Sequence, residues 1–225
     1  MTVTVPTLSI IFMAVSCAVC FLTPLALFLY LRLVKKADVY PFFAGCAVML
    51  LFAFILESGL HNLVFSSPAG PAIRGSIWLY ALYGGFEAIV ITGLTMVNNI
   101  IWSVMINNGS ISTMLASLSG DQLVQAQQSI TLLATTPSYQ FLLGGVERLL
   151  AIALHIALSV IVWFAVKWEG KLYLYPAAIL IHFAVDAAAA LLSGLGVNVI
   201  AIEVVVALLT AAAVLFARRL WRETM

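Results

Sequence analysis

The chain has 225 residues, of which 64% are hydrophobic and only 8% are charged, and its formal net charge is +1. An average soluble domain is about half apolar and about one quarter charged, so this composition, with a mean hydropathy of +1.15, excludes an ordinary soluble enzyme and predicts an integral membrane protein. Nucleic acid is excluded as a partner because there is no basic tract. At ~20 residues per span the chain accommodates about six or seven membrane helices in one domain, so any chemistry must lie among them.

The first predicted membrane helix covers about residues 7–33 and is followed by a basic cluster that contains Lys35 and Lys36. It is longer than the apolar core of a signal peptide, about 7 to 15 residues, and no basic residue precedes it, so we interpret it as a retained helix. Basic clusters favour the cytoplasmic side, which predicts an external N-terminus. The three cysteines of the chain all lie in apolar runs and are expected to pack as small hydrophobic residues.

A second span is predicted at about residues 41–65, and it carries two ionisable side chains near its end. Glu57 and His61 are four residues apart, so they share a helix face on which the carboxylate can accept a hydrogen bond from the imidazole. Two interpretations remain open: a structural or gating pair near the membrane surface, or a contribution to an active site.

Residues 77–106 form a third apolar segment that is too long for a simple span. As one helix it measures about 45 Å, against a hydrocarbon core of roughly 30 Å. Gly84 and Gly85 permit close helix approach or a kink. Glu87 follows directly, and a carboxyl group in hydrocarbon is expected to be protonated or paired.

The stretch of about residues 107–140 is polar and contains no Lys or Arg. Its apolar residues recur at a loose helical spacing, which predicts a surface helix or a pair of short helices outside the membrane.

The fourth predicted span, residues 144–163, places an acid, a base and an imidazole in one apolar run. Residues 148 and 155 are seven positions apart and therefore return to nearly the same helix face, with residue 147 at its margin. Charges inside a bilayer cost ~3 kcal/mol on insertion scales and usually face a partner or a wet cavity. Glu147, Arg148 and His155 are therefore candidate functional residues, although an ion pair that ties helices together is an equally good explanation for Arg148.

A fifth span is predicted at about residues 172–192 and a sixth at about residues 197–216. His182 and Asp186 are four residues apart on one face of the fifth span, a spacing that lets the carboxylate accept the second ring N–H of a ligating histidine. Glu203 on the sixth span is interpreted as structural. The fold class is therefore all-α, a polytopic membrane helix bundle of six predicted spans.

The charge distribution along the chain favours seven crossings over six. With six spans and an external N-terminus, the basic residues around 167–171 and 218–222 would face outward, against the positive-inside rule. One more crossing between residues 77 and 107 places every basic cluster inside. The segment 77–84 is too short to supply that crossing.

Four runs of sequence resemble one family: GGVERLLAIALH at 144–155, IHFAVD at 181–186, ESGLH at 57–61 and WLYALYGG at 78–85. They resemble the YhfC family of intramembrane peptidases, relatives of the CAAX-processing and bacteriocin-immunity group. Members usually carry a Glu-Glu-x-Gly-Arg signature and a Gly-His-Gly-Gly-x-Glu-Ala signature on successive helices. Here the first is absent and the second is reduced to YGGFEA, with Tyr83 in place of histidine, as though one helix were missing.

The resemblance implies an intramembrane endopeptidase of metal-dependent or glutamate-dependent type, in the cell (plasma) membrane of a bacterium, acting on a peptide or membrane-protein substrate. It suggests Glu87, Glu147, Arg148, His155 and His182 as catalytic residues. Our own hypothesis for a zinc cofactor is that His155 and His182 supply two imidazole ligands and that Glu87, or alternatively Glu57, supplies a carboxylate. The residues expected to support them are Glu57, His61 and Asp186. The alternative is a non-catalytic scaffold, binding or immunity-type protein on the same fold, because the absent glutamate pair is a candidate for the water-activating base.

Overall fold

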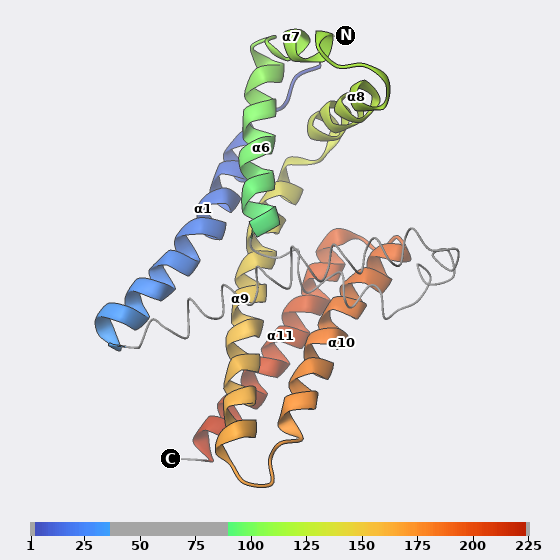
Figure 1. Ribbon diagram of the computed structural model, residues 1–225. Coiled ribbons are helices and arrows are strands. Elements are labelled where there is room, and N and C mark those ends of the chain that lie inside the picture. The colour runs from blue at the N-terminus through green and yellow to red at the C-terminus, as the bar shows by residue number, and fades with distance from the viewer. Residues whose placement is uncertain (1–2, 37–89, 224–225) are drawn as a thin grey trace. The chain divides into compact units, whose positions relative to one another are not determined.

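The computed structural model describes residues 3–36 and 90–223, and within them every regular element is helical (Figure 1). This confirms the all-α prediction. The predicted span at 41–65 and the start of the segment at 77–106 lie outside the described residues. Glu57, His61 and Glu87, three of the predicted site residues, lie there as well.

Four of the helical stretches are long and apolar enough to cross a membrane, which confirms a polytopic membrane helix bundle. They are Thr7–Val34, Ser138–Lys167, Leu174–Gly194 and Val199–Arg222. The first consists of α1 (Thr7–Leu29) and a π-helical turn (Tyr30–Val34), in which the amide of Lys35 donates to the carbonyl oxygen of Tyr30, five residues back, at 3.2 Å.

The described residues divide into two compact units. The first unit contains α1 as far as Thr23, then α6 (Val90–Asn107), α7 (Ile111–Ala116), α8 (Gly120–Thr135) and α9 (Ser138–Lys167) as far as Leu149. The sequence left open one surface helix or a pair of short helices in the polar stretch, and α7 and α8 agree with the second alternative. The core of this unit is built from Val5, Met13, Met96, Ile106, Ile130, Leu133 and Phe141.

Helices α1 and α9 approach closely within the first unit because small residues face each other there. Ser16 is completely buried, and its hydroxyl donates to the backbone carbonyl of Phe141. A Cβ atom built on Gly145 would lie only 3.0 Å from the Cα of Ser16. Membrane helices pack tightly at such positions because small side chains let backbones approach.

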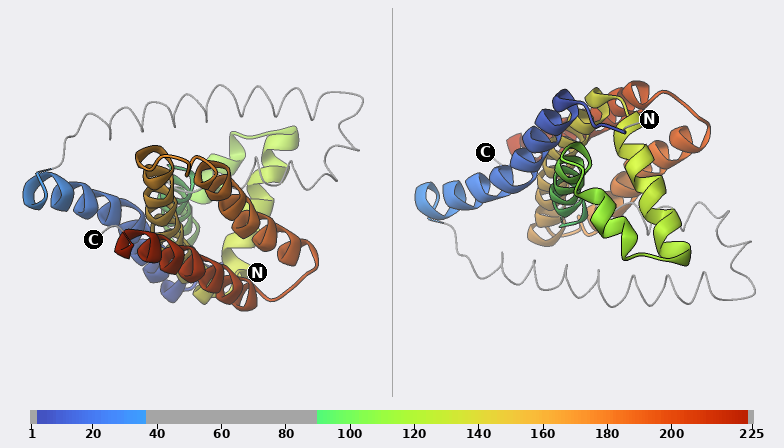
Figure 2. Two further views of the ribbon diagram at one scale, coloured as in Figure 1. Left: turned by 90° about the horizontal axis from the view of Figure 1, so that it is seen from below. Right: turned by 90° about the horizontal axis from the view of Figure 1, so that it is seen from above.

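The second unit contains the end of α1 from Pro24 with the π-helical turn, the rest of α9, and helices α10 (Leu174–Gly194) and α11 (Val199–Arg222). Short connections join α9, α10 and α11, so these three helices run alternately up and down, and seen from below they do not form a single layer (Figure 2). Phe164 and Ile161 on α9 are fully buried at the centre of the core. The Asn198 side chain begins α11 by accepting the amide hydrogen of Ile200 at 2.8 Å.

Helix α9 is longer than the predicted span at 144–163, because it begins at Ser138 and ends at Lys167. Pro137 directly precedes its first turn, and its carbonyl accepts the amide of Gln140 at 3.0 Å. Proline is well suited to the start of a helix, where its missing N–H has no partner to lose. Helices α10 and α11 agree with the two last predicted spans, with α11 extended into the basic residues as far as Arg222.

Candidate active site

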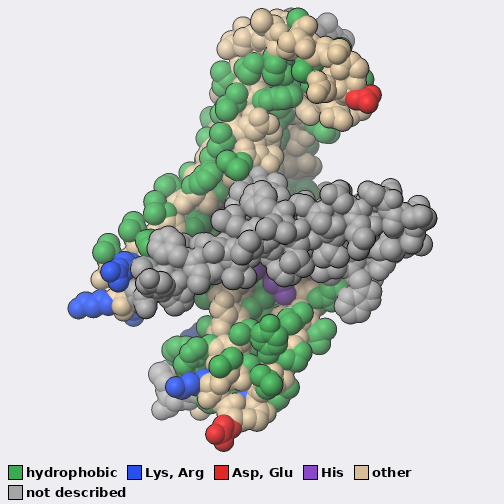
Figure 3. Space-filling model, in the orientation of Figure 1, with side chains coloured by type: hydrophobic (Ala, Val, Ile, Leu, Met, Phe, Trp, Pro, Cys, Tyr) green, Lys and Arg blue, Asp and Glu red, His purple; other side chains and the backbone are tan. Residues whose placement is uncertain are grey.

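The second unit brings two imidazole side chains together from neighbouring helices. His155 lies on α9 and His182 on α10, and their ring centroids are 5.0 Å apart with the ring planes inclined at 54°. Both residues are half-buried, and histidine side chains are visible at the surface in Figure 3. Two histidines that the sequence separates by 27 positions therefore meet in space.

A carboxylate supports one of these imidazoles. The Oδ2 atom of Asp186 lies 2.7 Å from Nδ1 of His182, and the two side chains are only 16% and 24% exposed. This contact confirms the prediction that positions 182 and 186 face each other across one helical turn. With Nδ1 directed at a carboxylate, Nε2 is the nitrogen of His182 that can serve a ligand, and the ring is held in one orientation.

Glu147 and Arg148 form an ion pair in the first unit. Nη2 of Arg148 lies 2.6 Å from Oε1 of Glu147, and the arginine side chain is 8% exposed whereas the glutamate side chain is 46% exposed. The Nε and Nη1 atoms of this arginine are buried and have no hydrogen-bond partner among the described residues. A buried guanidinium with unused donors is suited to an anion or a polarised carbonyl oxygen.

The histidine pair satisfies part of the requirement for a zinc site. Two imidazoles on one tetrahedral zinc ion, with Zn–N bonds of about 2.0–2.1 Å, have ring centroids roughly 5 Å apart, which agrees with the observed 5.0 Å. Catalytic zinc usually takes three protein ligands. Within residues 3–36 and 90–223 no group of three His, Cys, Asp or Glu side chains is close enough to hold a metal. The third predicted ligand, Glu87, lies outside those residues.

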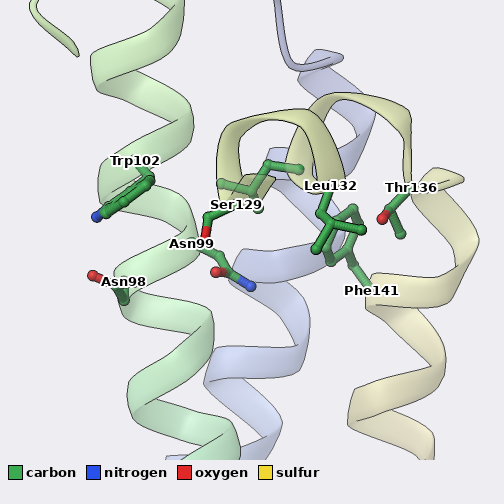
Figure 4. A pocket seen from close by; sticks show the side chains of 8 residues that line it. Asn98, Asn99, Trp102, Ser129, Leu132, Thr136 and Phe141 are labelled. Carbon is green, nitrogen blue, oxygen red and sulfur yellow. The ribbon is translucent and has the colours of Figure 1, made fainter. Parts of the chain in front are cut away.

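A separate cavity of about 310 Å³ lies in the first unit between α6, α8 and the start of α9. Figure 4 shows Asn98, Asn99 and Trp102 projecting from α6, opposite Ser129 and Leu132 of α8. Among the described residues, the side chains that line this cavity are apolar, amide or hydroxyl groups and none is titratable. No cavity was predicted here, and the signal that could have indicated one is the Asn-Asn pair at positions 98 and 99 in an apolar segment.

The fold and the paired imidazoles define the class of this protein: an integral membrane protein with ionisable groups gathered between its helices. The profile of the family described as "YhfC intramembrane metalloprotease" matches residues 80–209. The chain is also 30% identical to a Bacillus subtilis (strain 168) protein described as "Uncharacterized membrane protein YhfC", over 92% of this chain and 94% of the relative. The chain therefore belongs to the YhfC family. No solved structure matches it.

The alignment with the Bacillus subtilis protein is longer than this chain. It spans 247 residues, whereas 92% of the 225 residues is about 207, so about 40 aligned positions have no residue in this chain. That number is enough for one membrane helix and a loop at ~20 residues per span. The expected absence of a helix between residues 77 and 107 stays a prediction, because the alignment length does not locate the gap.

Proposed function

We propose that this protein is a metal-dependent intramembrane endopeptidase, and that His155 and His182 are two of its metal ligands. The observation that carries the proposal is the imidazole pair, with centroids 5.0 Å apart and with Asp186 supporting one ring. The description of the family supports the reaction class. Its substrates are then peptide bonds of membrane-embedded or membrane-adjacent segments in the cell (plasma) membrane of a bacterium.

The chain's own residues have distinct roles in this proposal. A zinc ion held here supplies a more acidic water and polarises the scissile carbonyl. Asp186 accepts the N–H of His182 and holds the ring in place, and Glu87 is the proposed third ligand. Glu57 and His61 are proposed to support these groups from the second predicted span.

We propose that Glu147 accepts a proton from water and that Arg148 stabilises the negative charge that develops on the carbonyl oxygen. The Glu147 carboxylate is partly exposed, so it can accept a proton from water. The unused donors of the Arg148 guanidinium can bind the oxyanion that forms during peptide hydrolysis. The ion pair between them holds the carboxylate in one orientation.

A non-catalytic scaffold, binding or immunity-type role is the second candidate. It is favoured by the roughly 40 aligned positions that this chain lacks and by the absence of the Glu-Glu-x-Gly-Arg signature from the sequence. In that case the histidine pair only joins α9 to α10, and its loss affects folding without any activity to remove.

The test compares His155→Ala and His182→Ala with two controls on the same helices, Ile156→Ala and Leu180→Ala. Both control side chains are exposed, by 47% and 60%, so their truncation leaves the core intact. Each purified protein is assayed for zinc by mass spectrometry and for cleavage of a fluorogenic transmembrane peptide. We expect both histidine variants, and neither control, to lose zinc and cleavage.

Asp186→Asn extends the test to the residue behind the imidazole. Loss of such a supporting carboxylate typically weakens metal binding about 10–100-fold, so zinc affinity measured with a competing chelator should fall by that factor. Wild-type zinc content in folded His155→Ala and His182→Ala proteins would refute the ligand assignment. A wild-type protein that binds zinc but does not cleave the peptide would favour the scaffold role.

A further inference from the structure

One end of helices α9, α10 and α11 brings together the end of α9, the start of α10 and the end of α11. Helix α9 ends at Lys167, α10 begins seven residues later at Leu174, and α11 returns antiparallel to α10 and ends at Arg222 (Figure 1). Ring contacts confirm the meeting, because the centroid of Trp221 lies 5.9 Å from those of Trp163 and Phe164. The side chains at this end can therefore act on one ligand together.

We call this end the basic rim. Its cationic side chains are those of Lys167, Lys171, Arg218, Arg219 and Arg222. Together they carry a formal charge of +5, and Glu169 and Glu223 carry −2, so the net charge of the rim is +3. Arg219 Nε lies 3.2 Å from the Glu223 carboxylate. The other four cations are exposed, and among the described residues none of them is in an ion pair.

Amphipathic aromatic side chains surround these cations. Trp163 and Trp221 are 49% and 48% exposed, and Tyr173 and Tyr175 are exposed at the start of α10. The ammonium group of Lys171 lies 5.7 Å above the Tyr173 ring. Trp and Tyr concentrate where the headgroups of a bilayer meet its hydrocarbon, because their rings are apolar and their N–H or O–H groups are polar.

The opposite end of α10 and α11 lacks both features. Residues 193–200, SGLGVNVI, contain no charge, no Trp and no Tyr. General anchoring at two interfaces would place aromatic residues at both ends. The asymmetry therefore indicates a ligand present on one side of the membrane only.

We propose that the basic rim binds the headgroups of anionic phospholipids in the cytoplasmic leaflet. A phosphodiester offers acceptor oxygens to Lys and Arg, while the acyl chains below it lie against the exposed faces of Trp163 and Trp221. Anionic headgroups attract basic segments next to a membrane helix. Binding of this kind weakens when salt screens exposed charges.

The test measures quenching of rim tryptophan fluorescence by brominated lipids. A Trp78→Phe/Trp102→Phe background leaves only Trp163, Trp168 and Trp221 as emitters. The protein is reconstituted in phosphatidylcholine vesicles that contain an equal small fraction of brominated phosphatidylglycerol or brominated phosphatidylcholine. At low salt we expect brominated phosphatidylglycerol to quench at least about twofold more strongly than brominated phosphatidylcholine. At 1 M salt, where the Debye length is about 3 Å, we expect the two lipids to quench equally.

Two charge variants separate the rim from overall charge. Lys171→Gln/Arg218→Gln/Arg222→Gln should remove the preference and keep the quenching by brominated phosphatidylcholine, which shows that the helix ends still lie at the interface. Arg32→Gln/Lys35→Gln/Lys36→Gln removes the same charge near the end of the first span and should keep the preference. Equal quenching of the wild type by both lipids, or equal loss in both variants, overturns the proposal. Abolition by millimolar glycerol phosphate also overturns it, because the ligand is then a small phosphate.

Discussion

Replacement of Gly145 by alanine tests whether the contact between α1 and α9 is as close as the structure shows. The added Cβ would meet Oγ, Cα and Cβ of Ser16 at 2.7, 3.0 and 3.2 Å. The hydroxyl can rotate, but the Cα atom is backbone, so one helix must shift by several tenths of an ångström. Overpacking of this kind costs about 1–3 kcal/mol, against a gain of at most about 1 kcal/mol in helix propensity.

Gly144→Ala is the matched control because it changes the neighbouring position of the same helix. Its Cβ would meet only the terminal methyl of Met96 at 3.2 Å, the far end of a flexible side chain. The propensity gain is the same in both variants, so the difference between them isolates the backbone contact. We expect Gly145→Ala to be less stable than Gly144→Ala by about 1–3 kcal/mol in reversible unfolding from mixed micelles by sodium dodecyl sulfate. Equal stability of the two variants would refute the close approach.

Two further substitutions test the packing of each unit. Ser16→Ala removes the buried hydrogen bond to the Phe141 carbonyl and should lower stability by about 0.5–1.5 kcal/mol, whereas Ser129→Ala, an exposed hydroxyl bonded within its own helix, should have no measurable effect in the same assay. Phe164→Ala leaves a cavity at the centre of the second unit. The Phe164 ring is completely buried there, and its centroid lies 4.5 Å from that of the Trp168 ring. We expect this variant to lose up to about 3–5 kcal/mol of unfolding free energy. The control Phe216→Ala should lose much less, because its side chain is 38% exposed. Equal losses in the two variants would contradict the assigned core.

The helices were largely predictable because hydrophobic spans in a membrane protein must be helical to satisfy their backbone groups. Residues 172–192 and 197–216 thus correspond closely to α10 and α11. The start of α9 was not predicted, because the helix begins in polar sequence and its signal is a single proline at 137. The length of α11 was underestimated because its last turns are basic rather than apolar, and arginine is a good helix former outside the hydrocarbon.

The site was predictable where it depends on one helix and much less so where it depends on two. The contact between His182 and Asp186 follows from a spacing of four residues. The meeting of His155 with His182 depends on the packing of α9 against α10, which helical periodicity does not specify. For Arg148 the sequence left open a functional role or an ion pair that ties helices together, and the ion pair in the structure, with the adjacent Glu147, lies within α9. The roles of all these residues in catalysis stay predictions.

The turn between α10 and α11 has a consequence for how the protein enters the membrane. Residues 195–198 are uncharged, and the one amide side chain among them already uses its oxygen to begin α11. Carrying this turn across the hydrocarbon therefore requires no charged group to lose its water. The two helices can be inserted together as a hairpin. The arginine residues after position 217 stay on the cytoplasmic side, where the chain is synthesised, and they set the orientation of the hairpin in the membrane. Substitution of one residue of this turn by lysine should slow insertion of the hairpin, without altering the contacts that either helix makes in the folded protein.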